Sequence, residues 1–224
     1  MRTNIFNSAT AAEQLTVGTS WQVASPLTTI VPEGSTIATA TATALSIALP
    51  LKAVDFFTAV DCGEKKTVEM LLNNNPTFIN EFNLDGKTAL MIAANNNYVE
   101  IVDLLLKHKA DANLQNINGG TALIRAAIKG YEKIVNKLLE HKAKVDIQSI
   151  SGWTALVFAM VNNYTDIVKL LIQKGAKIEF EDVHNRTPLM IATIYNKPSF
   201  VELLLEHKPD VNVDHQNKLG ETPL

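Results

Sequence analysis

Apolar side chains between residues 85 and 117 recur with the spacing of α-helices. In the segment 99–108 they fall on one side of a helix, at Ile101, Val102, Leu105 and Leu106. The shorter segment 89–96 contains the small pair Ala93-Ala94, which lets a neighbouring helix approach closely. Thr88 stands where its hydroxyl caps the first segment, and Asn97 tolerates a left-handed turn between the two. The pattern predicts two short antiparallel helices joined by a tight turn.

The same pattern returns every 33 residues. Thr88-Ala89-Leu90 has counterparts that begin at Thr121, Thr154 and Thr187, and a further one at Thr222 after 35 residues. The turn residue Asn97 is followed in the same register by Gly130, Asn163 and Asn196. One helix pair alone leaves its apolar stripe exposed, so burial requires that successive pairs stack. The sequence therefore predicts an array of stacked helix pairs.

The 33-residue period, the Thr-[Ala/Pro]-Leu start, the Ala-Ala pair and endings such as Ala110-Asp111-Ala112-Asn113 resemble the ankyrin repeat family. The resemblance covers residues 55–224. It implies an all-α, ankyrin-type repeat solenoid of antiparallel helix pairs with β-hairpin fingers between them. The register predicts five repeats, at 55–84, 85–117, 118–150, 151–183 and 184–218. The first is degenerate, and an incomplete start of another repeat follows the fifth.

Two departures from the family pattern bear on stability. Apolar residues replace the usual His after Thr-Pro-Leu; they are Met91, Ile124, Val157 and Met190. The Gly that usually follows the second helix is kept as Gly175 and replaced by Lys109, Lys142 and Lys208. Each lysine costs about 1 kcal/mol if the backbone stays left-handed there. We expect a stable array that is not idealised.

Residues 1–54 differ from the rest of the chain. Their only charged residues are Arg2, Glu13, Glu33 and Lys52, and they carry no sustained helical pattern. We expect a disordered Thr/Ala-rich leader; packing onto the first repeat, or a short strand, is the alternative. The uncharged stretch 35–49 is shorter than the roughly 20 residues of a spanning helix, so membrane contact is not expected.

The composition and the motifs limit the kinds of partner and of chemistry that we expect. With 20 Lys and Arg against 23 Asp and Glu the net charge is −3, so no basic field attracts nucleic acid. The lone Cys62 excludes an intrachain disulfide. No phosphate-binding glycine loop, HExxH, GxSxG or paired-cysteine motif occurs, so we expect neither a cofactor nor catalysis. His108, His141 and His207 share one repeat position, but repeats stack on the order of 10 Å apart, which is too far to share a metal ion.

The remaining candidates lie on the hairpin tips and the exposed side of the first helices, where the resemblance places partner contacts. Trp, Tyr and Arg dominate binding energy at protein interfaces, so we expect a hot spot at Trp153, Arg186, Arg125 and Tyr195. The expected partner-binding set is completed by Lys87, Asp85, Lys129 and His184. A competing interpretation folds Trp153 onto its own hairpin or into a cation-π contact with Arg186, because a finger position offers little else to bury against.

These observations favour a protein-protein interaction module: a monomeric, cytoplasmic, non-enzymatic scaffold that binds a partner protein through hairpin tips and a concave helical face. The alternative is the targeting arm of a longer, C-terminally truncated enzyme or effector, because the chain stops six residues into a further repeat. A structural tether with residues 35–49 at a membrane is a third hypothesis. The identity of the partner does not follow from the fold.

Overall fold

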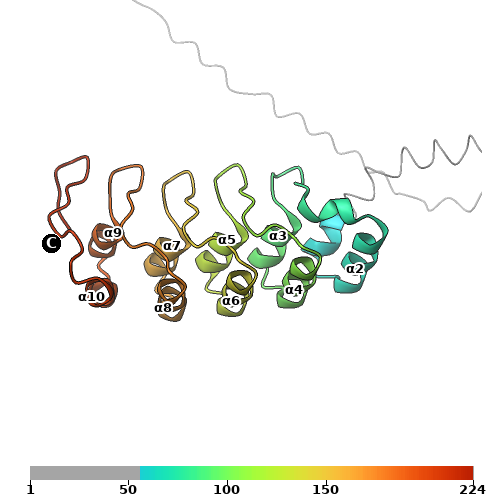
Figure 1. Ribbon diagram of the computed structural model, residues 1–224. Coiled ribbons are helices and arrows are strands. Elements are labelled where there is room, and N and C mark those ends of the chain that lie inside the picture. The colour runs from blue at the N-terminus through green and yellow to red at the C-terminus, as the bar shows by residue number, and fades with distance from the viewer. Residues whose placement is uncertain (1–55, 224) are drawn as a thin grey trace, which may run out of the picture. The chain divides into compact units, whose positions relative to one another are not determined.

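The structure, a computed structural model, describes residues 56–223 (Figure 1). These residues form a series of short helix pairs, which confirms the all-α architecture predicted from the period. The expected leader, residues 1–54, lies outside the described residues, as does Asp55.

Each pair consists of a first helix and a somewhat longer second helix. After a helical segment at 56–61, the helices are α2 (Lys65–Asn74), α3 (Ala89–Asn95), α4 (Val99–Lys107), α5 (Ala122–Lys129), α6 (Glu132–Glu140), α7 (Ala155–Val161), α8 (Thr165–Gln173), α9 (Pro188–Ile194) and α10 (Pro198–His207). A 3₁₀ turn, Pro76–Asn80, follows α2. The ends of α3 and α4 lie within one residue of those predicted from the hydrophobic pattern.

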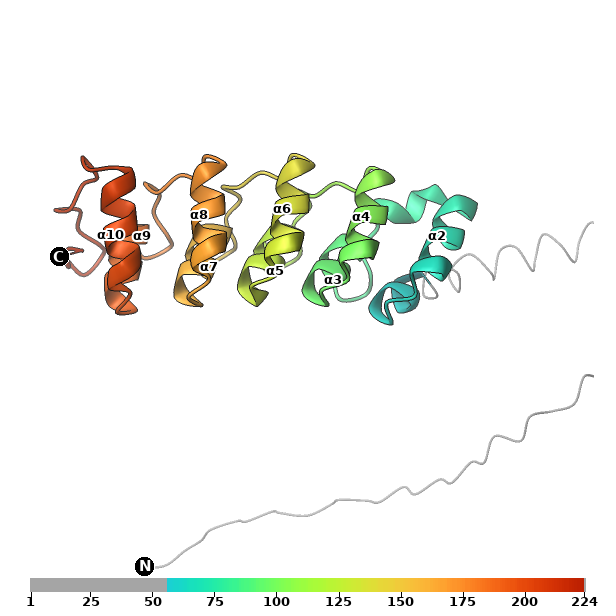
Figure 2. The same cartoon turned by 90° about the horizontal axis from the view of Figure 1, so that it is seen from below.

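The helices form two rows (Figures 1 and 2). The first helices α3, α5, α7 and α9 pack side by side in one row, and α2, α4, α6 and α8 pack in the other. The apolar stripes are buried in this arrangement; in α6 they comprise Ile134, Val135 and Leu138, all fully buried. Burying one such side chain contributes about 1.5–3 kcal/mol, so stacking supplies the stability that a single pair lacks.

Threonine side chains cap three of the first helices. The hydroxyl oxygens of Thr88, Thr121 and Thr187 each accept a hydrogen bond from the backbone N–H three residues on, at 3.2–3.3 Å. Thr154 has the same extended backbone, but its buried hydroxyl has no hydrogen-bond partner among residues 56–223. The same residue at the same repeat position therefore caps one helix and not another.

The turns have the backbone conformations that their repeat positions predicted, with one exception. Positive φ angles occur between the helices of a pair at Asn97, Gly130, Asn163 and Asn196. After the second helices, Lys109 and Lys142 both have φ of 64°. Lys208 has φ of −140° instead, because Pro209 follows it and favours extended backbone in the preceding residue. The expected strain therefore falls on two lysines, not three.

Candidate partner-binding surface

Between one helix pair and the next the chain makes a tight turn, here called a finger, that rises on one side of the helix rows (Figure 1). The fingers are residues 83–87, 116–120, 149–153, 182–186 and 217–221; in each, the first backbone N–H donates to the fifth carbonyl. Among the described residues the only isolated strand bridge joins Phe82 and Thr88. The fingers are therefore closed turns with little strand pairing.

A side chain at the start of most fingers holds the turn. Oδ1 of Asn116 accepts hydrogen bonds from the N–H groups two and four residues on, at 3.1 and 2.7 Å. Oδ1 of Asp182 does the same at 2.8 and 3.0 Å, and Asn83 and Asn217 repeat the arrangement. One side-chain oxygen is enough for this task.

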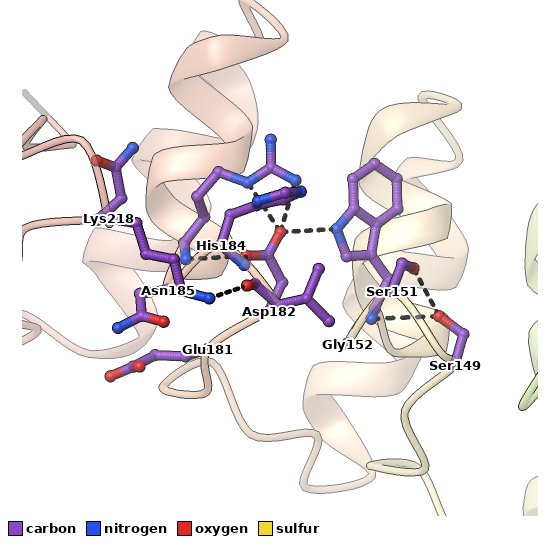
Figure 3. Close-up of polar contacts among 12 residues, drawn as sticks. Ser149, Ser151, Gly152, Glu181, Asp182, His184, Asn185 and Lys218 are labelled. Atoms are coloured by element: carbon purple, nitrogen blue, oxygen red, sulfur yellow. Dashed lines mark hydrogen bonds and ion pairs between the residues drawn. The ribbon is translucent and has the colours of Figure 1, made fainter.

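Asp182 differs from the asparagines because it has a second carboxylate oxygen. This Oδ2 accepts from Trp153 Nε1 at 3.1 Å and from Arg186 Nε at 2.8 Å, and Arg186 Nη2 lies 2.6 Å away (Figure 3). Burial raises the pKa of this carboxyl, but hydrogen bonds from the Arg186 side chain, the neighbouring backbone and the indole outweigh burial and hold the pKa below its usual value. The charged carboxylate therefore joins the fingers of two successive repeats.

Close backbone packing accompanies this link. Gly152 has φ of 79°, and a Cβ at that position would come within 2.6 Å of the Cα of Asp182. The N–H of Val183 donates to the carbonyl of Ser151 at 3.3 Å. Fingers 149–153 and 182–186 thus form one connected unit.

Trp153 is half-buried, and the expectation that it has little to pack against is wrong. Its ring contacts Phe158 edge-on at a centroid distance of 5.3 Å and Tyr195 at 5.9 Å. These three residues are called the aromatic cluster below. Tyr195 is 42% exposed and the adjacent Ile194 is 53% exposed. The cluster therefore offers an apolar surface whose rings are held by their neighbours.

Arg125 belongs to a second group of candidate residues. It is half-buried on α5 and, together with Lys87, lines a cavity of about 100 Å³. The cavity is completed by Asp61, Met91, Ile92, Asn95 and Asn96. Lys129 lies one helical turn after Arg125 and is exposed. The structure thus brings the predicted residues together as two groups.

Asp85 and His184 lie near finger tips and are exposed. Asp85 forms an ion pair with Lys87 of the same finger at 3.3 Å, and His184 uses its backbone N–H to complete the Asp182 turn. Because surface ion pairs contribute little, Asp85 leaves Lys87 available to other charges.

Sequence reasoning missed Asp182, Phe158 and a row of apolar finger-tip residues. The row consists of Leu84, Ile117, Ile150 and Val183, all exposed. The 33-residue interval between its members was a usable signal. The signal for Asp182 was its position, where the other fingers have a neutral Asn or Ser.

Between residues 56 and 223, no group of three or more His, Cys, Asp or Glu is placed to hold a metal ion. No helix in this part of the chain is long and apolar enough to cross a bilayer. His108 and His141 occupy the C-terminal caps of α4 and α6, where a partial positive charge is favourable.

The family comparison agrees with the helix pairs and fingers. The family described as ankyrin repeats (3 copies) matches residues 56–149 and 141–215, well over half of the chain. The chain belongs to the ankyrin repeat family. Ankyrin repeats are generally protein-protein interaction modules and are typically non-catalytic. A comparison with curated proteins finds no match.

Proposed function

We propose that this chain binds a partner protein through its first-helix face, which we define as the exposed sides of α3, α5, α7 and α9 with the adjoining fingers. The aromatic cluster is the observation that carries the proposal. The Trp153 ring contacts both Phe158 and Tyr195, yet Tyr195 and the neighbouring Ile194 remain about half exposed. Trp, Tyr and Arg are the residues that dominate binding energy at interfaces.

The expected advantage of this surface is pre-organisation. The Trp153 indole is hydrogen-bonded to Asp182 and packed against two rings before any partner arrives. Side chains that are already ordered lose little rotamer entropy on binding. A few such anchors then supply most of the affinity, while the finger tips contribute complementarity.

The finer parts of this proposal come from the sequence. We take the module to be non-catalytic, cofactor-free, monomeric and cytoplasmic, with residues 1–54 as a leader separate from the repeats. The alternative, that the array is the targeting arm of a longer enzyme or effector, is tested by reading the coding sequence beyond residue 224.

Affinity capture from cell lysate tests the proposed surface. The bait is the full chain, compared with the double variant Arg125→Ala/Trp153→Ala. The matched control is Lys133→Ala/Lys169→Ala, which removes two exposed side chains of the second helices α6 and α8. We expect a protein that the wild type and the control retain and the first double variant loses.

Equal retention by all three baits would contradict the surface assignment. Circular dichroism of each bait checks that its helix content is unchanged, so that a lost partner reports on the surface and not on the fold.

A further inference from the structure

The cavity lined by Arg125 has a size and a charge that point to its occupant. Its volume of about 100 Å³ is well below the roughly 300–1,000 Å³ of pockets that hold small molecules. It has room for one side chain of a partner. Met91 and Ile92 supply an apolar part of the lining, and Asn95 and Asn96 supply amides.

The charged groups of the cavity are unequally satisfied. The Asp61 carboxylate accepts a hydrogen bond from Asn96 Nδ2 at 3.0 Å. Within residues 56–223, the Lys87 ammonium pairs only with the exposed carboxylate of Asp85. Arg125 has no ion pair with any carboxylate of residues 56–223. Two cations and one anion therefore line the cavity. Lys87 is paired with Asp85 outside the lining, and the Arg125 guanidinium has donors to spare.

The Arg125 guanidinium lies beside Gly120 of finger 116–120. A Cβ at Gly120 would be 3.5 Å from Arg125 Nε and 3.6 Å from Nη2. The equivalent positions of the other four fingers carry Lys87, Trp153, Arg186 and Glu221. A Cβ at Gly120 would be in ordinary van der Waals contact with the guanidinium, so Arg125 lies against this finger. The finger thus supports the Arg125 head group beside the cavity.

We infer that this cavity receives the side-chain carboxylate of an Asp or Glu on the partner protein. The inference rests on the proposed function, since it assigns one contact within the same face. An Arg fork binds a carboxylate with two charge-assisted hydrogen bonds, and Lys87 and Lys129 add positive charge around it. The ligand class is therefore an acidic segment of a protein.

The aromatic cluster predicts a second feature of the partner segment, an apolar residue at a set distance from the acidic one. Neighbouring helices lie about 8–10 Å apart, so α5 and α9 are separated by roughly 20 Å. An extended chain advances about 3.3–3.6 Å per residue, so the partner segment carries an apolar or aromatic residue about six positions from the acidic one.

A selection from a random 12-residue peptide display library tests this inference on the full chain. Three immobilised proteins are compared: the wild type, Arg125→Gln and Lys133→Gln, the last removing an exposed charge from α6. We expect the wild type and Lys133→Gln to select peptides of one kind. In these peptides an acidic residue stands about six positions from an aromatic or aliphatic one. Arg125→Gln should lose the preference for the acidic residue.

One selected peptide is then resynthesised with Gln in place of its acidic residue. Charge-assisted contacts change affinity about tenfold or more when lost, so the Gln peptide and Arg125→Gln should each raise Kd by that factor. The Gln peptide tested against Arg125→Gln should show no higher Kd than either change alone, because both changes remove the same contact. Arg125→Lys, which keeps the charge, should recover part of the affinity. Equal melting temperatures of the variants exclude a folding defect.

The outcomes separate the two claims. Selected peptides that lack acidic residues but lose binding in Trp153→Ala would overturn the carboxylate contact and leave the proposed face intact. Peptides that depend on neither Arg125 nor Trp153 would count against both claims, as would the absence of any enriched peptide.

Discussion

The repeats at 85–150 and those at 151–218 build the same helix pairs and fingers, but they add different chemistry to them. In the first pair of repeats the fingers begin with neutral asparagine or serine, and the cations in and beside the cavity are the half-buried Lys87 and Arg125 and the exposed Lys129. In the second pair, finger 182–186 begins with a buried aspartate that binds Trp153, and aromatic rings gather beside it.

The comparison teaches that the scaffold and the binding surface use different atoms of the same residues. One oxygen of Asn116 or Asp182 closes the finger in either half. Only the second oxygen of Asp182 reaches across to the preceding repeat. A repeat protein can thus vary its surface without altering the turn that carries it.

The largest difference in stability between the halves should appear when the first residue of a finger is replaced. Asp182→Ala leaves the half-buried Arg186 and the Trp153 indole without their acceptor, and should lower the free energy of unfolding by about 3 kcal/mol. Asn116→Ala removes only the turn bonds and should cost about 1–2 kcal/mol. Urea unfolding of the two variants checks this order, and equal losses would show that the Asp182 contacts add nothing.

Acid sharpens the same comparison. The pKa of Asp182 is lower in the folded chain than its usual value, which is about 3.9 in an unfolded chain. Its contribution to stability is therefore complete above about pH 5 and is lost as the pH falls through the folded pKa. The difference in the free energy of unfolding between wild type and Asp182→Ala, measured by urea unfolding, should stay constant from pH 7 to 5 and narrow below about pH 4. A difference that widens on acidification would contradict the lowered pKa.

A smaller effect, of opposite sign in the two halves, is expected at the helix caps. Thr121→Val removes the hydroxyl that accepts from Ile124 N–H at 3.2 Å and should destabilise by about 1 kcal/mol. Thr154→Val removes a buried hydroxyl that has no partner within residues 56–223 and should stabilise by up to about 1 kcal/mol. Thermal unfolding of both variants tests the sign, and destabilisation of similar size by both would mean that Thr154 also caps its helix.

The smallest effect concerns the turns after the second helices. Lys142→Gly relieves a left-handed conformation with φ of 64° and should stabilise by about 0.5–1 kcal/mol. Lys208→Gly is the matched control, because its φ of −140° gives glycine no such advantage and the substitution removes an ion pair with Glu179. A gain in melting temperature at residue 208 as large as that at residue 142 would refute the explanation by strain.

Much of the fold could be predicted from the sequence because the period encodes it. Thr88, Asn97 and Lys142 have the capping or left-handed roles that their repeat positions predicted. Lys208 departs because a neighbour, Pro209, overrides the position. The family match over residues 56–149 and 141–215 confirms the class of fold.

The candidate site was less predictable, because it depends on contacts between repeats. Trp153 and Tyr195 were selected by residue type, but their common contact could not be read from residues 42 positions apart. The missing hydrogen bond of the Thr154 hydroxyl could not be predicted either, since Thr121 at the same repeat position does cap its helix. Periodicity predicts the average repeat, and function depends on departures from it.

The most direct test of the central claim is the Kd of the captured partner, measured by calorimetry for the full chain and its variants. The proposed surface predicts that Arg125→Ala/Trp153→Ala raises Kd by about 100-fold or more, while Lys133→Ala/Lys169→Ala leaves it within about twofold of the wild type. A Kd that is unchanged in the first double variant, or that rises only in the second, would contradict binding through the first-helix face.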